Sequence, residues 1–406
     1  MDTVKPEDHE PYAHMAEKVI SPFHYFHEVY RDRLREARSA QRSGKVIVGY
    51  VGNTVPIELI IAAGCFPLRV APIAGTTANA DRYVESFTDV DARLIVELYI
   101  AGELDFLSRL VVPRSTEAYH KLYLSLRELK RVGVAQAGPE VILYEILHTQ
   151  RTASREYGLA RTRELAKRLS VVGGSPVCDD SLAPAIAASN QTRRLLARLQ
   201  QSRRRADQPV SGYQAHIVTG AGNFLGRHHY NQLLADWLDS PQIGTAPGPR
   251  LLVKGCPLDH AYLHELVEMA GGQVVAEDDD WGARAAEPLL RTEGSPLAAV
   301  FDHYYSEVPC PRTFPASLGE QWFMKTLQAG FIDGVVFYLP IPDDVLGWDF
   351  PRQRAAAEAA GLTWRLVRSD VRYPENRPAV AAMLGKYVGS LQPEGGGDKK
   401  PLATIS

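Results

Sequence analysis

The sequence predicts an α/β protein made of two Rossmann-like domains with parallel sheets, joined by a helical segment. Two observations favour this class. Short apolar runs typical of buried strands alternate with helical patterns. The alternation begins near Lys45 and restarts near Arg250, after the proline- and glycine-rich joint SPQIGTAPGPR. Because strands that alternate with helices form parallel sheets, we expect one such sheet on each side of the joint.

The first strand–helix–strand unit lies in KVIVGYVGNTVPIELIIAAGCFPLRV, which begins at Lys45. VIVGYV is expected to form a buried strand, PIELIIAAG a helix that begins at Pro56 and ends at Gly64, and FPLRVAP a second strand. Further on, RLVVP predicts a third strand with a helical pattern on either side. In parallel sheets of this kind the ligand site lies at the carboxyl ends of the strands.

These patterns divide the chain into five segments. They are an N-terminal helical extension (1–44), a first α/β domain (45–140), a helical segment (141–240), a second α/β domain (241–390) and a disordered tail (391–406). The helical segment is assigned from patterns such as REYGLARTRELAKRL, and the tail from its polar, glycine-rich composition.

Composition excludes several classes of protein. The 406 residues include 45 Lys and Arg against 48 Asp and Glu, so the basic excess of a nucleic-acid-binding protein is missing. The longest apolar run, Ile57 to Val70, is interrupted by charged residues, glycine and proline, and is shorter than the roughly 20 residues that cross a bilayer. The acidic, polar N-terminus is unlike a secretory signal. We therefore expect a cytoplasmic protein with no nucleic-acid or membrane partner.

The four cysteines, Cys65, Cys178, Cys256 and Cys310, lie far apart, and no two have the CxxC spacing. This usage is not that of a disulfide framework, and it contains no local zinc or iron–sulfur signature.

From GYVGNTVPIELIIAAGCFPLRV onward, the sequence resembles the 2-hydroxyacyl-CoA dehydratases. This family includes the D-component of 2-hydroxyglutaryl-CoA dehydratase and the subunits of ATP-dependent benzoyl-CoA reductase. Further similar segments follow in the family's order over roughly residues 45–370. They are ELDFLSRLVVPRSTEAYHKLY, SLAPAIAASNQTRRLLARLQQSR, KGCPLDHAYLHELVEMAGGQVVAEDD and FIDGVVFYLPIPDD with FPRQRAAAEAAGLTWRLVRSD. The resemblance implies the family's fold and an acyl-CoA ligand.

The resemblance also implies a particular chemistry. In the family, three cysteines hold a [4Fe-4S] cluster with one iron open to the substrate thioester, and thiolates are the ligands that such clusters use. A separate activator ATPase delivers a low-potential electron. The resulting ketyl radical makes an otherwise non-acidic β-proton removable, so that water can leave.

This chain departs from the family at all three cluster-ligand positions, which fall at Gly52, Thr116 and Asp343. Glycine has no ligand atom, a hydroxyl is a poor ligand for iron, and a carboxylate prefers hard metals. We therefore expect no [4Fe-4S] cluster and no cofactor in this chain, with a divalent metal as the alternative.

Polar residues at the ends of the predicted strands are expected to line one pocket. Glu117 and Asp343 are the candidate catalytic acid and base, with pKa values set by burial. The candidate substrate-binding residues are Gly52, Asn53, Thr54, Thr116 and Asp344. The alternative is that these polar side chains only cap the helices that follow them.

Two further groups of residues are candidates for binding. His260 and His264 are spaced to share one helix face, and Asp259, Asp278–Asp280 and His303 are the nearest candidates to complete a divalent metal site. Arginines at 193, 194, 198 and 203–205 form a basic stripe suited to the phosphates of CoA. The alternative for both groups is a solvated helix face.

The favoured hypothesis is a cluster-free subunit of a 2-hydroxyacyl-CoA dehydratase or benzoyl-CoA reductase-like complex, and so part of a lyase or reductase. It would bind an acyl-CoA thioester and pair with a related, cluster-bearing chain as a heterodimer, or with a second copy as a homodimer. The alternative is an independent, non-radical hydratase, dehydratase or C–C lyase that uses Glu117, Asp343 or a replacement metal. A binding protein without turnover is a third, weaker hypothesis.

Overall fold

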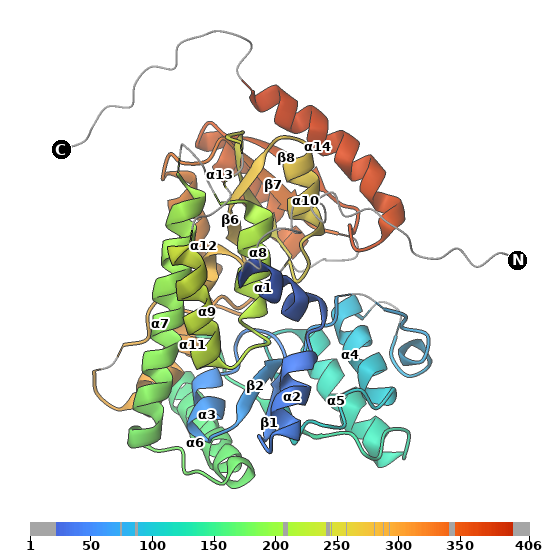
Figure 1. Cartoon of the computed structure of the whole chain (residues 1–406), viewed down its shortest axis with the longest axis vertical. Coiled ribbons are helices and arrows are strands. Elements are labelled where there is room, and N and C mark those ends of the chain that lie inside the picture. The colour runs from blue at the N-terminus through green and yellow to red at the C-terminus, as the bar shows by residue number, and fades with distance from the viewer. Residues whose placement is uncertain are drawn as a thin grey trace, which may run out of the picture.

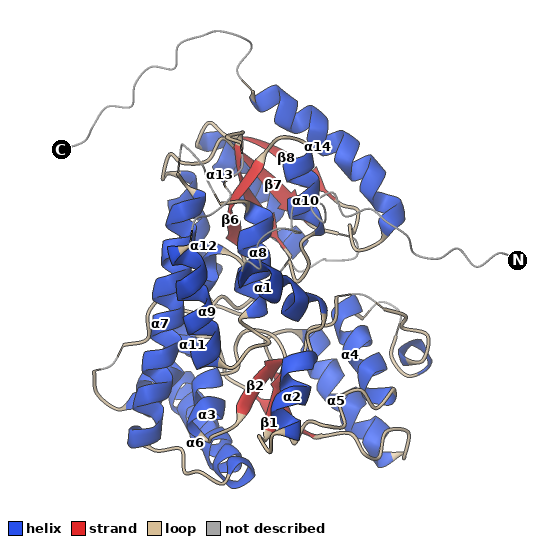
Figure 2. Cartoon of the chain, viewed as in Figure 1, coloured by secondary structure: helices blue, strands red, loops and turns tan. Residues whose placement is uncertain are grey.

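The computed structural model describes residues 22–392, except 74, 86–87, 206–209, 241–243, 245, 257, 280, 287, 292 and 341–345. Its described part contains two separate four-stranded parallel sheets with helices around and between them (Figures 1 and 2). The predicted fold class, α/β with two Rossmann-like parallel sheets, is confirmed.

The two sheets share one strand order. In the first, the order is β2-β1-β3-β4, and in the second it is β6-β5-β7-β8. The strands of the first sheet are β1 (Ile47–Tyr50), β2 (Phe66–Arg69), β3 (Arg109–Pro113) and β4 (Glu140–Tyr144). Those of the second are β5 (Arg250–Gly255), β6 (Gln273–Asp278), β7 (Gly334–Tyr338) and β8 (Thr363–Val367). All neighbouring strands run parallel.

Fourteen α-helices and four short 3₁₀ turns lie in the described residues. The helices are α1 (Pro22–Arg31), α2 (Arg35–Arg42), α3 (Ile57–Ala62), α4 (Val90–Ile100), α5 (Glu117–Arg131), α6 (Thr152–Gly173), α7 (Asp179–Arg203), α8 (Gly212–Ala221), α9 (Arg227–Asp239), α10 (Tyr262–Met269), α11 (Pro296–Ser306), α12 (Ala316–Leu327), α13 (Phe350–Ala359) and α14 (Arg377–Leu391). The 3₁₀ turns are η2 (Ala80–Arg82), η3 (Ala283–Ala286), η4 (Leu346–Trp348) and η5 (Pro374–Asn376).

Each sheet buries both faces, which explains why its strands appear in the sequence as nearly continuous apolar runs. One face of the first sheet packs on α4 and α5, and the other on α3 and α6. In the second sheet, α10 and α14 cover one face, and α12 and α13 cover the other. Figure 1 shows these layers above and below the region of α1 and α8.

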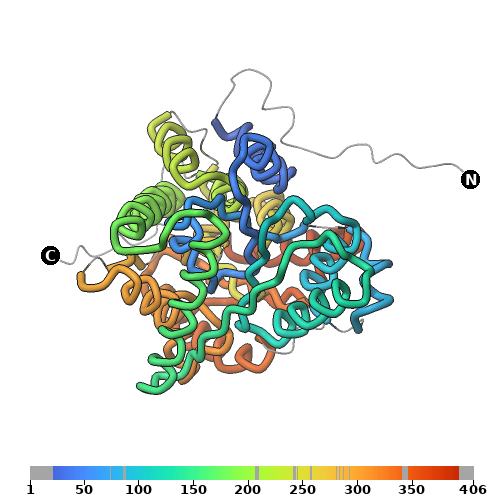
Figure 3. The backbone as a smooth tube through the Cα atoms, turned by 90° about the horizontal axis from the view of Figure 1, so that it is seen from below, coloured from blue at the N-terminus to red at the C-terminus, as the bar shows by residue number. Residues whose placement is uncertain are grey.

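Helix α7 contacts α3 beside the first sheet and also β6 of the second, so it joins the two halves (Figure 1). Helix α11, which comes late in the chain, packs against α6 and α7, and Phe301 lies in the core of the first sheet. From below, the orange α11 region lies next to the green helices of the middle of the chain (Figure 3). The predicted boundary between the first α/β domain and the helical segment, between residues 140 and 141, falls inside strand β4.

Candidate functional site

The turn after β1 lies at the switch point of the first sheet. From β1 the chain proceeds to β2 on one side, whereas β3 lies on the other side. Open α/β sheets bind ligands in the crevice that such a reversal leaves at the carboxyl ends of the strands. In this chain the crevice is bordered by the Gly52–Pro56 turn after β1 and by Arg114–Thr116 after β3.

Gly52 and Asn53, both predicted site residues, line a cavity at this switch point. Gly52 has φ +67°, and a Cβ atom there would lie 2.9 Å from Cε2 of Tyr119, so the turn requires glycine. The Asn53 amide donates a 2.8 Å hydrogen bond to the carbonyl of Pro309, which ties the turn to the segment after α11. Thr54 is buried next to them.

Thr116 and Glu117 lie apart from this cavity's lining. The Thr116 hydroxyl accepts a hydrogen bond from the Tyr119 amide and caps helix α5, as the alternative interpretation of these residues expected. The Glu117 side chain is 70% exposed and pairs with Arg312 at 2.9 Å, without the burial that the sequence-based hypothesis assumed for it. Asp343 and Asp344 fall outside the described residues.

We call the space at the end of β1 the arginine cavity. It has a volume of about 140 Å³, and four arginines from separate parts of the chain line it: Arg69, Arg193, Arg227 and Arg284. Among the described residues that line it, none is an aspartate or a glutamate. The cavity is therefore electropositive.

Arg193 has a buried carboxylate partner. Arg193 donates to Glu58 at 3.3 Å and to Nε2 of His303 at 3.2 Å, while the Tyr304 hydroxyl donates to Glu58 at 2.9 Å. Burial on its own would raise the pKa of Glu58, but Arg193, His303 and Tyr304 hold it below the usual value. Burial also lowers the pKa of His303, so this imidazole is neutral near pH 7. Glu58 is thus an ionised, fully buried partner for Arg193.

Arg284 shares its carboxylate partner with a second cation. The Arg284 guanidinium donates to Oδ1 of Asp278 at 2.7 Å, and Nζ of Lys254 lies 2.6 Å from Oδ2 of the same carboxylate. One negative charge therefore faces two positive charges. Arg69, at the end of β2, stacks its guanidinium 4.3 Å from the ring centroid of Trp281.

The carboxyl ends of the two sheets face each other next to this cavity. Buried Arg33 donates to the carbonyl of Ala71, just after β2, and to the carbonyl of Asp259, just after β5. Its guanidinium also lies over the rings of Tyr30, Phe224 and Trp281. Burial, assisted by Asp91, raises the pKa of Asp259 to about 7.

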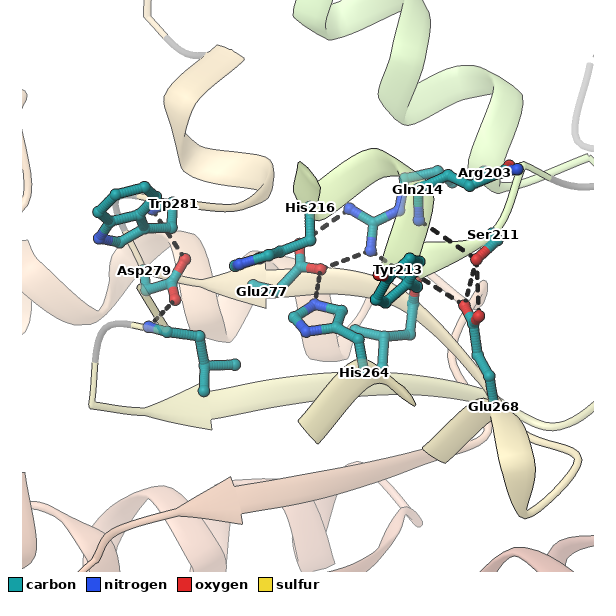
Figure 4. Close-up of polar contacts among 12 residues, drawn as sticks. Arg203, Ser211, Tyr213, Gln214, His216, His264, Glu268, Glu277, Asp279 and Trp281 are labelled. Carbon is teal, nitrogen blue, oxygen red and sulfur yellow. Dashed lines mark hydrogen bonds and ion pairs between the residues drawn. The ribbon is translucent and has the colours of Figure 1, made fainter. Parts of the chain in front are cut away.

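At the second sheet the predicted metal-ligating residues are engaged in another way (Figure 4). His264 hydrogen-bonds at 2.7 Å to Oε1 of Glu277, which also pairs with Arg203 at 2.6 Å. Burial would raise the pKa of Glu277, but Arg203 and His264 hold it far below its usual value. Burial lowers the pKa of His260 to about 3. Within the described residues, no three His, Cys, Asp or Glu side chains are grouped so that they could hold a metal ion.

The basic stripe on α7 does not form one face. Arg193 lines the cavity, Arg198 pairs with Asp239 at the surface, and Arg203 is buried against Glu277. Five residues advance a helix by about 140°, so positions 193, 198 and 203 point in three directions. The prediction that all of these arginines share one basic or solvated face is therefore wrong, although Arg194 and Arg198 are both exposed.

Fold and cavity together define a two-domain α/β protein with an arginine-lined cavity at the ends of parallel strands. The model of the family "2-hydroxyglutaryl-CoA dehydratase, D-component" matches residues 53–363, and the chain belongs to this family. The membership that the resemblance indicated is confirmed.

Two characterised relatives are similar over most of their length. The chain is 19% identical over 354 residues to the (R)-phenyllactyl-CoA dehydratase beta subunit of Clostridium sporogenes, covering 84% of this chain and 92% of the relative. It is 23% identical over 318 residues to a benzoyl-CoA reductase subunit of Thauera aromatica, covering 75% of this chain and 80% of the relative. Both are named as subunits. In the described part of this chain, no helix is long and apolar enough to span a membrane.

The side chains at the end of β1 do not fit the three-thiolate set that the family resemblance implies. Gly52 has no side chain, and the Thr116 hydroxyl is occupied as a helix cap. One cysteine does come near, since Sγ of Cys310 lies 3.9 Å from the carbonyl of Ser115. Burial raises its pKa to about 11, so it is a protonated thiol at neutral pH. One protonated thiol cannot replace three thiolates, so these residues do not support a cluster of the family's kind.

Four residues that line the cavity were not predicted from the sequence: Arg69, Arg227, Arg284 and Ser189. Arg69 carried a usable signal, because a charged residue ends the otherwise apolar strand FPLR and so marks its carboxyl end. The others come from helices or turns far along the chain, and only the fold brings them together.

Proposed function

We propose that this chain is a cluster-free subunit of a 2-hydroxyacyl-CoA dehydratase or benzoyl-CoA reductase-like complex. In this proposal it binds an acyl-CoA thioester and pairs with a related chain that carries the [4Fe-4S] cluster. One observation carries the proposal: where the family resemblance puts the first cluster ligand, Gly52 borders an arginine-lined cavity. The fold and the family membership support the proposal, as does the lack of a thiolate at Gly52 and Thr116.

The size of the cavity limits which part of a thioester it accepts. Its 140 Å³ correspond to the space of roughly five waters, well below the 300–1,000 Å³ of pockets that enclose whole drug-sized ligands. An acyl group fits this volume, whereas CoA does not. We therefore place the acyl end inside and the pantetheine and nucleotide outside. Arginine N–H groups around the cavity are suitable donors to the thioester carbonyl oxygen.

The proton-carrying groups near the cavity have distinct roles in this proposal. Neutral His303 accepts from Arg193 and lies 3.4 Å from Glu307, so it orients the arginine and carries no charge of its own. Asp259, with a pKa of about 7, is a buried carboxyl that can exchange its proton near neutral pH. Any activator ATPase acts on the cluster-bearing partner.

Thioester binding is tested by isothermal titration of the full chain with butyryl-CoA and with free CoA. The proposal predicts that butyryl-CoA binds more tightly, because only the thioester has an acyl group to fill the cavity. Equal affinity, or no binding of either compound, would contradict it.

Pairing is tested by co-expression with a cysteine-bearing chain of the same family, followed by size-exclusion chromatography without oxygen. With an activator ATPase and ATP supplied as the electron source, a mixed complex that turns over a 2-hydroxyacyl-CoA, when neither chain does so alone under the same conditions, is the expected result. Turnover by this chain alone would instead favour an independent, non-radical enzyme.

A further inference from the structure

Among the described residues, the cations Arg193, Arg227, Arg284 and Lys254 at or beside the arginine cavity outnumber the carboxylates that pair with them. Glu58 compensates Arg193, and Asp278 is shared between Arg284 and Lys254. Within the described part of the chain, Arg227 has no ion pair with a carboxylate, and its buried Nε has no hydrogen-bond partner. A neutral acyl chain would not need this excess, because burying cations without counter-charges is costly.

A second observation points to a missing polar ligand. Ser189 lies in the middle of α7 and is 3% exposed, and it lines the cavity. Its hydroxyl oxygen is buried and has no hydrogen-bond partner among the described residues. Buried hydroxyls are almost always satisfied, and leaving one unsatisfied costs about 1–3 kcal/mol. A ligand with oxygen acceptors would satisfy Ser189 and Arg227 together.

The local backbone favours the same kind of ligand. Arg227 is the first residue of α9, a 13-residue helix whose first turn has no side-chain cap. Helix N-termini attract anions through their free N–H groups and the helix dipole. Thr192 and Thr219 contribute further polar side chains to the lining.

We propose that the arginine cavity binds a small oxyanion, the carboxylate or phosphate of a ligand of a few non-hydrogen atoms, held by Arg227, Arg69 and Ser189. Guanidinium forks suit both groups, and the small volume excludes a nucleotide. The oxyanion can belong to a free acid, to inorganic phosphate, or to an acyl group that carries a second acidic group. Only the third of these ligands, the acyl group with a second acidic group, rests on the proposed function.

The test is isothermal titration of the full chain with inorganic phosphate, glutarate and the neutral diamide glutaramide. The same titrations are made with R227Q and with R198Q. Arg198 is the matched control, because it lies on α7 at the surface, paired with Asp239 and away from the cavity. We expect phosphate or glutarate to bind, glutaramide not to bind, and R227Q to weaken anion binding at least tenfold while R198Q leaves it unchanged. If neither anion binds, or if R227Q and R198Q bind equally well, the proposal is wrong.

The S189A variant is a control for loss of anion binding that results only from unfolding. Removing an unsatisfied buried hydroxyl should leave the melting temperature of the ligand-free chain unchanged or slightly higher, while anion affinity falls severalfold. A lower melting temperature with unchanged affinity would show that the hydroxyl has an internal role and would contradict the proposal.

Titration with glutaryl-CoA and butyryl-CoA separates this inference from the proposed function. Tighter binding of glutaryl-CoA, with the advantage lost in R227Q, assigns the oxyanion to the acyl group. If the free anions bind and neither thioester does, the oxyanion site is supported and the proposed function is contradicted. If both thioesters bind equally and the free anions do not bind, the proposed function is supported and the oxyanion site is contradicted.

Discussion

The two sheets have the same strand order, yet their carboxyl ends differ. At the first sheet, the β1 turn borders a cavity whose described lining contains four arginines, no carboxylate, and a buried hydroxyl without a partner among the described residues. At the second, buried charged groups pair with one another, since Arg203 and His264 both reach Glu277, while Nε of Arg203 and Nδ1 of His264 have no partner among the described residues (Figure 4). A buried carboxylate paired with two basic side chains favours a structural role, whereas arginines at a cavity whose described lining contains no carboxylate favour a ligand site. We therefore infer that the function belongs to the first sheet's end.

The largest effect is expected from R203A, which breaks the network at the second sheet. Both partners of this ion pair are 1% exposed, so the loss of Arg203 leaves Glu277 buried without its main counter-charge. Breaking such a pair costs about 3–5 kcal/mol. Urea unfolding followed by circular dichroism would detect this. R198A, on the same helix, removes only a surface pair and should cost about 0–1 kcal/mol. Equal losses in the two variants would contradict the structural role of the network.

The second prediction concerns pH and the region between the two sheets. Burial and Asp91 raise the pKa of Asp259 to about 7, against opposing effects of Arg33, Arg372 and Arg69. The folded chain therefore holds a proton that the unfolded chain releases near pH 4, so this group's contribution to stability is lost as pH rises through 7. Since each pH unit corresponds to about 1.4 kcal/mol, the loss amounts to a few kcal/mol. D259N should be more stable than the parent at pH 8, and the difference should shrink towards pH 4. A difference that does not vary with pH would refute this.

A smaller effect is expected at the β1 turn. G52A places a Cβ atom 2.9 Å from the Tyr119 ring at φ +67°, whereas G44A has the same sign of φ (+85°) but meets no atom within 4 Å. Both variants carry the left-handed backbone penalty of about 1–2 kcal/mol. Only G52A should also weaken ligand binding in the arginine cavity. Thermal unfolding and titration together measure the two effects, and equal binding by both variants would contradict the placement of the site.

The smallest effects separate capping from catalysis after β3. T116A removes the cap of α5 and should lower the free energy of unfolding by about 1 kcal/mol. E117Q removes an exposed pair with Arg312 and should cost less. Denaturation curves test both. If E117Q nevertheless abolished turnover by the assembled complex, Glu117 would be a catalytic residue, as the sequence-based hypothesis holds.

The sequence was sufficient to predict the fold and the edge of the sheet at which the candidate site lies, but not its charges. Strands such as VIVGYV and RLVVP are apolar because they are buried on both faces, and Gly52 and Asn53 follow from the position of the first strand's end. Arg69, Arg227 and Arg284 were not predicted, because their convergence depends on how α9 and η3 pack against α7. The burial of His264 against Glu277 was not predicted for the same reason, since it depends on how α10 packs on β6.

The most direct test of the central claim is an analysis of iron and acid-labile sulfide. The chain is purified without oxygen, first alone and then with a cysteine-bearing chain of the same family. The account predicts no stoichiometric iron or sulfide in the lone chain, and one cluster in the mixed complex that stays with the partner when the two are separated. About four iron and four sulfide in the lone chain would contradict the claim that an arginine cavity stands in place of the cluster site.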